Sequence, residues 1–266
     1  MRHLTPYQTG LWLAEYGDVR CQLCRIYRST PQTKLLPNSL PTTIPSKHSF
    51  FTNLRQHVTD CFHSGLLCTS CHNSIVWLPK PFEVDISAAT TLSIQAATYY
   101  DYPVRQAIRA FKHHEDMTKL PLLLHILRQL PRPHGCHYDN SVIVAMPTTE
   151  QRLIKRGFDP VSILAAQLSK HWHIPLWSGV ERIDNTVSQQ GLTRSERLSN
   201  LDNAFALIQP PPVKRFLLFD DVATTGASLQ ALGRTLSGQS LSLTQTNTSP
   251  SPQYQLSAFA LAHGSQ

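Results

Sequence analysis

One stretch of the sequence constrains the fold more than any other. An apolar run at 216–219 is followed by two acids, Asp220 and Asp221, and then by two threonines, a glycine and a serine before leucines recur at helical spacing. This pattern predicts a buried strand over 216–219, a tight turn, and a helix over 228–236. Such a turn directs backbone N–H groups and hydroxyls at one point, where the helix dipole favours an anion.

The acids and the turn favour different parts of one ligand. Carboxylates repel a phosphate, but they accept hydrogen bonds from sugar hydroxyls and bind Mg²⁺. A sugar phosphate is the simplest ligand that satisfies both halves. The run is not a P-loop, because no Gly-Lys-Ser/Thr appears and Gly226 comes late. An ordinary acidic turn with helix caps would explain one acid and one hydroxyl, but not two acids and three hydroxyls around a glycine.

The same run resembles the binding loop of type I phosphoribosyltransferases, which hold 5-phosphoribosyl-1-pyrophosphate (PRPP). Their pattern is four apolar residues, two acids, a small residue, Thr-Thr-Gly and further small or hydroxyl residues. The resemblance implies that the acids engage the ribose hydroxyls, directly or through Mg²⁺, and that residues 223–228 cradle the 5-phosphate. The implied binding residues are Asp220, Asp221, Ala223, Thr224, Thr225, Gly226, Ala227 and Ser228.

Four cysteines near the N-terminus form two C-x₂-C pairs. Each pair lets two thiolates grip one metal, so that Cys21, Cys24, Cys68 and Cys71 together predict a tetrahedral structural Zn²⁺ site. Residues 28–60 are rich in Ser, Thr, Pro, Gln and Asn, and we interpret them as an inserted loop that leaves the two pairs free to meet.

Other uses of the cysteines remain open. Cys61, with His57 and His63 nearby, could replace one thiolate. A single C-x₂-C could be redox-active, although no βαβ pattern surrounds either pair. Four unrelated thiols would leave the repeated spacing unexplained. Cys136 is expected to be a bystander in a loop.

Composition sets broader limits. The chain has 266 residues and 24 basic against 17 acidic side chains, a net charge of +7 that is compatible with phosphate-bearing ligands or nucleic acid. The first residues carry no apolar signal region, and nothing approaches the roughly 18 consecutive apolar residues of a membrane helix. We therefore expect a cytoplasmic protein without membrane insertion, whose cysteines are reduced or metal-bound.

The rest of the chain alternates between strand and helix patterns from about residue 94. This rhythm predicts an α/β fold with a parallel sheet and ligands at the carboxyl ends of its strands. We expect two domains: a zinc-binding module over 1–80 with the polar insert 28–60, and an α/β domain over 94–266 with a polar insert at 237–253. The expected strands are 94–100, 142–146, 216–219 and 256–262, and the expected helices cover 104–111, 121–130, 161–168 and 228–236.

Taken together, the motifs resemble the ComF family, which includes GntX-type proteins. Besides the paired cysteines and the loop, the resemblance rests on the segments 100–112, 142–147, 156–159 and 186–205, with Asp159 where the family has Asn. It covers residues 21–262, with two long inserts that this family usually lacks. The family implies a type I phosphoribosyltransferase-like sheet flanked by helices and preceded by a small zinc-knuckle module.

The resemblance also implies further site residues and partners. Arg156 and Gly157, with Lys112, are the candidates for holding pyrophosphate, and Arg197 with Arg194 would lie in a mobile lid over 186–205. Arg156 could instead pair with Asp159, Lys112 could be merely solvated, and Arg197 could be structural. Relatives are associated with natural competence and use of external DNA, which implies single-stranded DNA or DNA-uptake proteins as partners. A phosphoribosyltransferase and a non-catalytic PRPP-sensing or DNA-uptake accessory protein both remain open, because no residue is recognisably placed to choose a nucleobase.

Overall fold

The computed structural model describes residues 9–11, 14, 20–26, 66–87, 90–183, 204–242 and 254–264. Contacts within the chain divide it into two compact units. The first combines Met1–Trp77 with Tyr102–Pro131, and the second combines Leu78–Asp101 with Arg132–Gln266.

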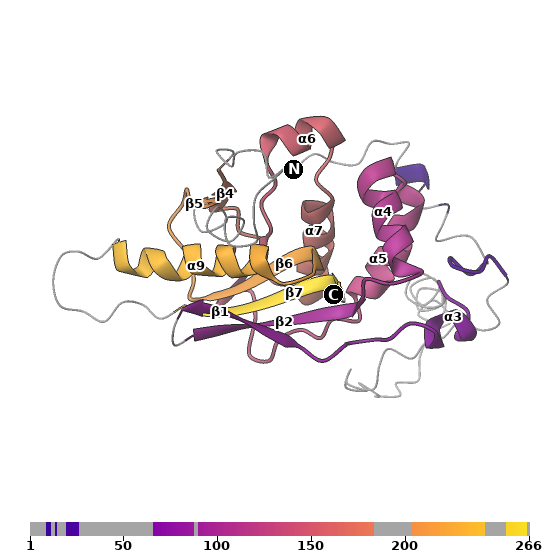
Figure 1. The fold of residues 1–266 in the computed structure, drawn as a ribbon, viewed down its shortest axis with the longest axis horizontal. Helices are drawn as coiled ribbons and strands as arrows, with labels where there is room; N and C mark the ends of the chain where they lie inside the picture. Colours follow the sequence, from indigo (N-terminus) through magenta and orange to yellow (C-terminus); the bar gives the residue numbers. More distant parts are fainter. Residues whose placement is uncertain are drawn as a thin grey trace, which may run out of the picture. The chain divides into compact units, whose positions relative to one another are not determined.

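A five-stranded, mostly parallel sheet forms the centre of the second unit (Figure 1). Its order is β1-β2-β7-β6-β3, in which only β1 runs antiparallel to its neighbour. The strands are β1 (Phe82–Ser87), β2 (Thr90–Tyr99), β3 (Ser141–Ala145), β6 (Arg215–Ala223) and β7 (Gln255–His263). The predicted α/β class with a parallel sheet is therefore confirmed at this level.

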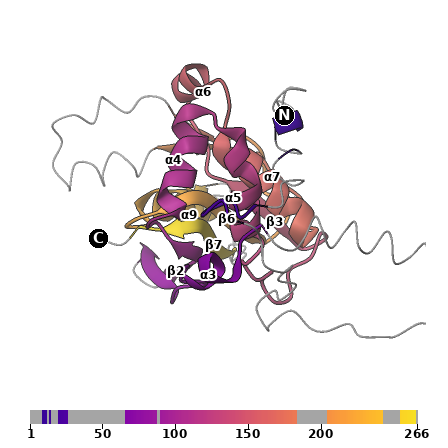
Figure 2. The same cartoon turned by 90° about the vertical axis from the view of Figure 1, so that its right-hand side faces the viewer.

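Helices cover both faces of this sheet. Trp172 of α7 (Pro160–Trp172) packs edge-on against Phe259 of β7, with ring centroids 5.0 Å apart. Gly233 of α9 (Ala227–Ser242) lies against Leu256 of the same strand. Successive side chains of a strand point to opposite faces, so residues 256 and 259 place α9 and α7 on opposite sides of the sheet (Figure 2).

Helix ends in the second unit are set by local capping. Asp159 is the N-cap of α7 and accepts hydrogen bonds from the N–H groups of Val161 and Ser162, with Pro160 at the first helical position. Thr149 caps α6 (Glu150–Arg156) in the same way, through the N–H of Arg152. No element was predicted at α6, whose seven residues include no buried side chain.

Several elements differ from those expected. The strand predicted at 216–219 runs on to Ala223, because Asp220, Val222 and Ala223 continue the pairing with β7. The helix predicted to stop at 236 continues to Ser242, into the expected insert. The last strand, predicted at 256–262, spans Gln255–His263 and lies between β2 and β6. Strand β1 and the small pair β4 (Val180–Arg182) and β5 (Phe205–Leu207) were not predicted.

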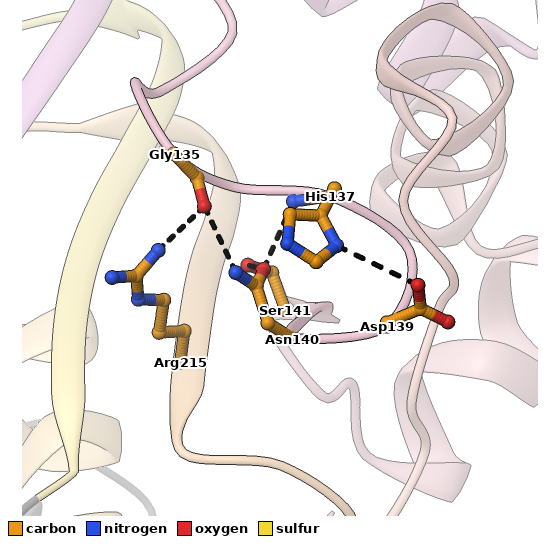
Figure 3. Close-up of polar contacts among 6 residues, drawn as sticks. All are labelled: Gly135, His137, Asp139, Asn140, Ser141 and Arg215. Atoms are coloured by element: carbon orange, nitrogen blue, oxygen red, sulfur yellow. Dashed lines mark hydrogen bonds and ion pairs between the residues drawn. The ribbon is translucent and has the colours of Figure 1, made fainter.

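An ordered polar loop lies at the amino ends of β3 and β6 (Figure 3). The side-chain amide of Asn140 donates to the Gly135 carbonyl over 2.9 Å, and its oxygen accepts from the N–H of His137 and the hydroxyl of Ser141. The Arg215 guanidinium donates to the same Gly135 carbonyl. These bonds satisfy backbone groups that a turn would otherwise leave to solvent, so the network is explained by structure alone.

The first unit is helical in its described part. It contains α3 (Thr69–Asn73), α4 (Val104–His114), the short 3₁₀ helix η1 (Met117–Lys119) and α5 (Leu120–Leu127). Val104, Ala107, Ile108 and Phe111 form the buried face of α4, as the apolar spacing predicted. The predicted domains are 1–80 and 94–266. Compactness alone does not show which parts of the chain fold independently, so this division stays a prediction.

Candidate functional site

The four cysteines of the two C-x₂-C pairs come together in the first unit. The Sγ atoms of Cys21, Cys24, Cys68 and Cys71 all lie within 4.8 Å of one another. Cys21 is buried, Cys24 is exposed, and the other two are intermediate. Four sulfur ligands, two from the turn at 21–24 and two from the start of α3, can hold a metal ion, so the predicted grouping of these residues is confirmed.

Backbone hydrogen bonds shape the first turn of the cluster. The N–H of Cys21 donates to the carbonyl of Ile26 over 2.7 Å, and the N–H of Arg25 donates to the carbonyl of Cys21 over 2.9 Å. Arg25 has a positive φ of 61°, which closes the turn. The N–H of Cys68 then donates to the Cys21 sulfur over 3.3 Å and so links the two pairs.

The sulfurs differ in their tendency to ionise. Burial acts to raise the pKa of Cys21, but N–H groups of Cys68, Cys24 and Leu23, together with the Cys24 thiol, lower it to about 7. The pKa of Cys71 is raised, first by burial and then by the adjacent sulfurs of Cys68, Cys21 and Cys24. Like charges this close cannot all form without a cation between them, and a bound metal removes that obstacle.

The two cysteines outside the C-x₂-C pairs are placed only in part. Cys61, His57 and His63 lie outside the described residues. Cys136 is buried in the second unit and is not a member of the cluster.

The acidic run forms a second candidate site, at the carboxyl end of β6. Asp221 is 3% exposed, whereas Asp220 is intermediate and accepts a hydrogen bond from the Asp221 N–H over 2.8 Å. Thr224 and Thr225 are exposed in the turn that follows, and α9 begins at Ala227. Strand, turn and helix are therefore arranged as the sequence predicted.

Gly226 allows the turn to approach the neighbouring strands. Its φ of +75° is in the left-handed region, and its carbonyl accepts the N–H of Gln230 over 2.8 Å at the start of α9. A Cβ atom at this position would lie 2.6 Å from Ile94 Cδ1 and 2.9 Å from Val84 Cγ1. Glycine is required here on both conformational and steric grounds.

The residues expected to hold pyrophosphate lie in different units. Arg156 is the last residue of α6, and Gly157 ends that helix with φ +73° and an N–H bonded to the Leu153 carbonyl over 2.8 Å. Lys112 is half-buried in the last turn of α4, which belongs to the first unit. Arg194 and Arg197 lie outside the described residues.

Comparison with known proteins adds a family relationship. No family model matches the chain. It is 33% identical to competence protein F of Haemophilus influenzae over 146 residues, which are 52% of this chain and 63% of that protein. It is also 33% identical to DNA utilization protein YhgH of Escherichia coli over 96 residues, 35% of this chain and 42% of that protein. These similarities support assignment of the chain to the ComF family.

The matches with these ComF-family relatives extend over less than two thirds of either relative's length. Among the described helices, none combines the length and the apolar character required to cross a bilayer.

No candidate site residue was predicted on β7. In the structure, His263 and Gly264 lie beside the acidic turn, at Ala223 and Thr224. Their position follows from the parallel pairing of β7 with β6, in which His263 is opposite Ala223. A single sequence does not reveal strand order, so no local signal marked these residues.

Proposed function

We propose that this chain is a phosphoribosyltransferase-like protein that binds PRPP or a related ribose phosphate at the acidic turn and contributes to competence and the use of external DNA. One observation carries the proposal: a buried acid, an exposed Thr-Thr pair and a left-handed glycine meet between a central parallel strand and a helix N-terminus. Anions are favoured at such helix ends, and ligands bind at the carboxyl edge of parallel sheets. The type I phosphoribosyltransferase fold is part of this proposal.

Each part of the turn would meet a different part of the ligand. The N–H groups of 223–228 and the hydroxyls of Thr224 and Thr225 would donate to the 5-phosphate. Asp220 and Asp221 would accept hydrogen bonds from ribose hydroxyls. Two adjacent carboxylates also suit Mg²⁺, which would neutralise pyrophosphate charge when bound.

The pyrophosphate would be held by cationic and backbone donors from elsewhere in the chain. We propose Arg156 and the backbone of Gly157 for this task. Lys112 and Arg197, the latter in the predicted lid, would contribute further positive charge. Asp159 is engaged as the N-cap of α7, which supports a role for Arg156 other than pairing with that acid.

We further propose that the four cysteines hold a structural Zn²⁺. A set of four thiolates matches the tetrahedral preference of zinc and leaves no open position for a substrate. This ion would therefore stabilise the first unit without taking part in chemistry.

Calorimetric titration with PRPP and Mg²⁺ tests the binding proposal. We expect saturable binding to the unaltered chain and a loss of at least about tenfold in affinity for Asp221→Asn, because a hydrogen bond to a charged group contributes about 1.5–3 kcal/mol. Asp139→Asn, which alters an exposed acid at the amino end of the sheet, is the matched control. Absence of PRPP binding, or equal affinities for all three proteins, would refute the proposal.

A second function is favoured by the names of the two relatives. A non-catalytic PRPP-sensing or DNA-uptake accessory protein would also fit competence protein F and DNA utilization protein YhgH. Exchange of labelled pyrophosphate into PRPP across a panel of nucleobases separates the two: exchange with one base supports the transferase. PRPP binding without exchange, together with single-stranded DNA binding that Cys68→Ser abolishes, supports the accessory role.

A further inference from the structure

The end of β7 holds the first peptide of the acidic turn from one side. The N–H of Gly264 donates to the Ala223 carbonyl over 2.9 Å, as part of the parallel ladder between β7 and β6. The His263 ring places Nδ1 3.1 Å from the same oxygen. A carbonyl oxygen can only accept, so Nδ1 carries the proton in this contact. Two consecutive residues thus occupy both lone pairs of one carbonyl.

The His263 ring is itself held by its neighbours. It packs against Phe82 with ring centroids 4.3 Å apart, and against Tyr99 at 5.9 Å. Phe82 also lies under the turn, where a Cβ at Gly226 would come within 3.2 Å of its ring. The imidazole is therefore wedged between β1, β2 and the turn, which limits its rotation.

Fixing this carbonyl also fixes the next N–H. The Ala223–Thr224 peptide is trans, so the N–H of Thr224 points opposite to the Ala223 oxygen. With the oxygen held by β7, that N–H must point away from β7. If the Ala223–Thr224 peptide were flipped, the Ala223 carbonyl would occupy the place where the turn is proposed to present the Thr224 N–H. Hydrogen-bond donors that already point toward the position of a ligand's charge bind that charge without first having to reorient.

Close packing adds a second restraint on the same residue. A Cβ atom at Gly264 would lie 2.6 Å from Cγ2 of Thr224 and 3.4 Å from its Cα. Only glycine lets β7 approach Thr224 this closely, so the hydrogen bonds and the packing act on the same peptide.

We propose that His263 is a positioning residue, which, with Gly264, orients the Thr224 N–H for the phosphate of the ligand. The inference rests on the proposed ribose-phosphate site, but its structural part concerns only the turn and β7. It assigns a role in ligand binding to a residue that contacts the turn, with no contact to the ligand required.

Two substitutions of His263 separate donation from packing. His263→Leu removes the donor and retains an apolar side chain, whereas His263→Asn keeps an N–H donor close to the position of Nδ1. His137→Leu is the matched control, because His137 is an exposed histidine in the loop at the opposite, amino end of the sheet (Figure 3). Gly264→Ala tests the packing restraint without altering the imidazole.

Two measurements are needed: calorimetric affinity for PRPP with Mg²⁺, and amide hydrogen exchange at Thr224–Ser228 without ligand. We expect His263→Leu to weaken affinity about threefold to tenfold, the equivalent of one hydrogen bond, and to accelerate exchange in this turn selectively. His263→Asn should recover most of both losses. Gly264→Ala should resemble His263→Leu, and His137→Leu should resemble the unaltered chain.

The proposal is overturned if His263→Leu matches the unaltered chain in both measurements, or if His263→Asn is as impaired as His263→Leu. Uniformly faster exchange across the sheet in His263→Leu would also overturn it, since that result indicates a general loss of stability. If the unaltered chain does not bind PRPP, the proposed function fails, while selective exchange in the turn and its recovery by Asn still decide whether His263 holds the turn.

Discussion

The cysteine cluster and the acidic turn are built on opposite principles. The cluster brings together four side chains from two segments that lie more than forty positions apart in the chain. Its four sulfurs cannot all be negatively charged at once without a cation between them. The turn is contiguous, and neighbouring strands hold its backbone through Gly226 and the Ala223 carbonyl. With the proposed Zn²⁺ bound, the first would depend on an ion for its form, whereas the second owes its form to the sheet.

Removal of one metal ligand should have the largest effect. We expect Cys71→Ser to lose bound zinc and to lower the melting temperature of the first unit markedly, because metal binding contributes on the order of 10 kcal/mol to the folding of small Zn²⁺ modules. Elemental analysis and thermal unfolding measure the two quantities. Cys136→Ser, which alters a buried cysteine outside the cluster, should keep its zinc. Full zinc content in Cys71→Ser would contradict the proposed site.

Gly226→Ala should have the next largest effect, through the backbone. The substitution combines a positive φ with a steric conflict against Ile94 and Val84, and we expect a destabilisation of about 2–4 kcal/mol in urea unfolding. Gly238→Ala is the control, because this exposed position of α9 has open space around it and should gain up to about 1 kcal/mol. A neutral Gly226→Ala would mean that the turn is not held by the sheet.

The exposed hydroxyls of the turn should affect binding rather than stability. Thr225→Val is expected to change the free energy of unfolding by less than about 0.5 kcal/mol, because the side chain is exposed. It should nevertheless weaken PRPP binding, since one donor to the phosphate is lost. Thr90→Val, at the exposed start of β2, should alter neither quantity. A large loss of stability in Thr225→Val would assign the hydroxyl to the fold.

The sequence predicted best where the signal is local. The apolar run at 142–146, the helical face of α4 and the repeated cysteine spacing each specify their structure through neighbours in the chain, and each was found. Prediction from the sequence was poor where the pairing of strands determines the structure. The acids at 220 and 221 belong to β6 because the pairing with β7 continues through Asp220 to Ala223, and no local pattern indicates that the strand extends so far.

Strand order was beyond the reach of a single sequence for the same reason. The last strand was predicted without a position in the sheet, and it lies between β2 and β6. The outer strand β3 is as apolar as the inner strands β6 and β7, so hydrophobicity does not distinguish an inner from an outer position. With the order unknown, the contact between His263 and Ala223 could not be inferred.

The central position of β7 imposes an order of events on synthesis. Strands β2 and β6 cannot be joined until residues 255–263 have left the ribosome, since β7 is the strand between them. Until then the nascent chain presents two unpaired strand edges, which are prone to misassociation. The peptide that begins the acidic turn is also held only once this strand is in place. Ligand binding at the turn would therefore mature with the last strand to emerge.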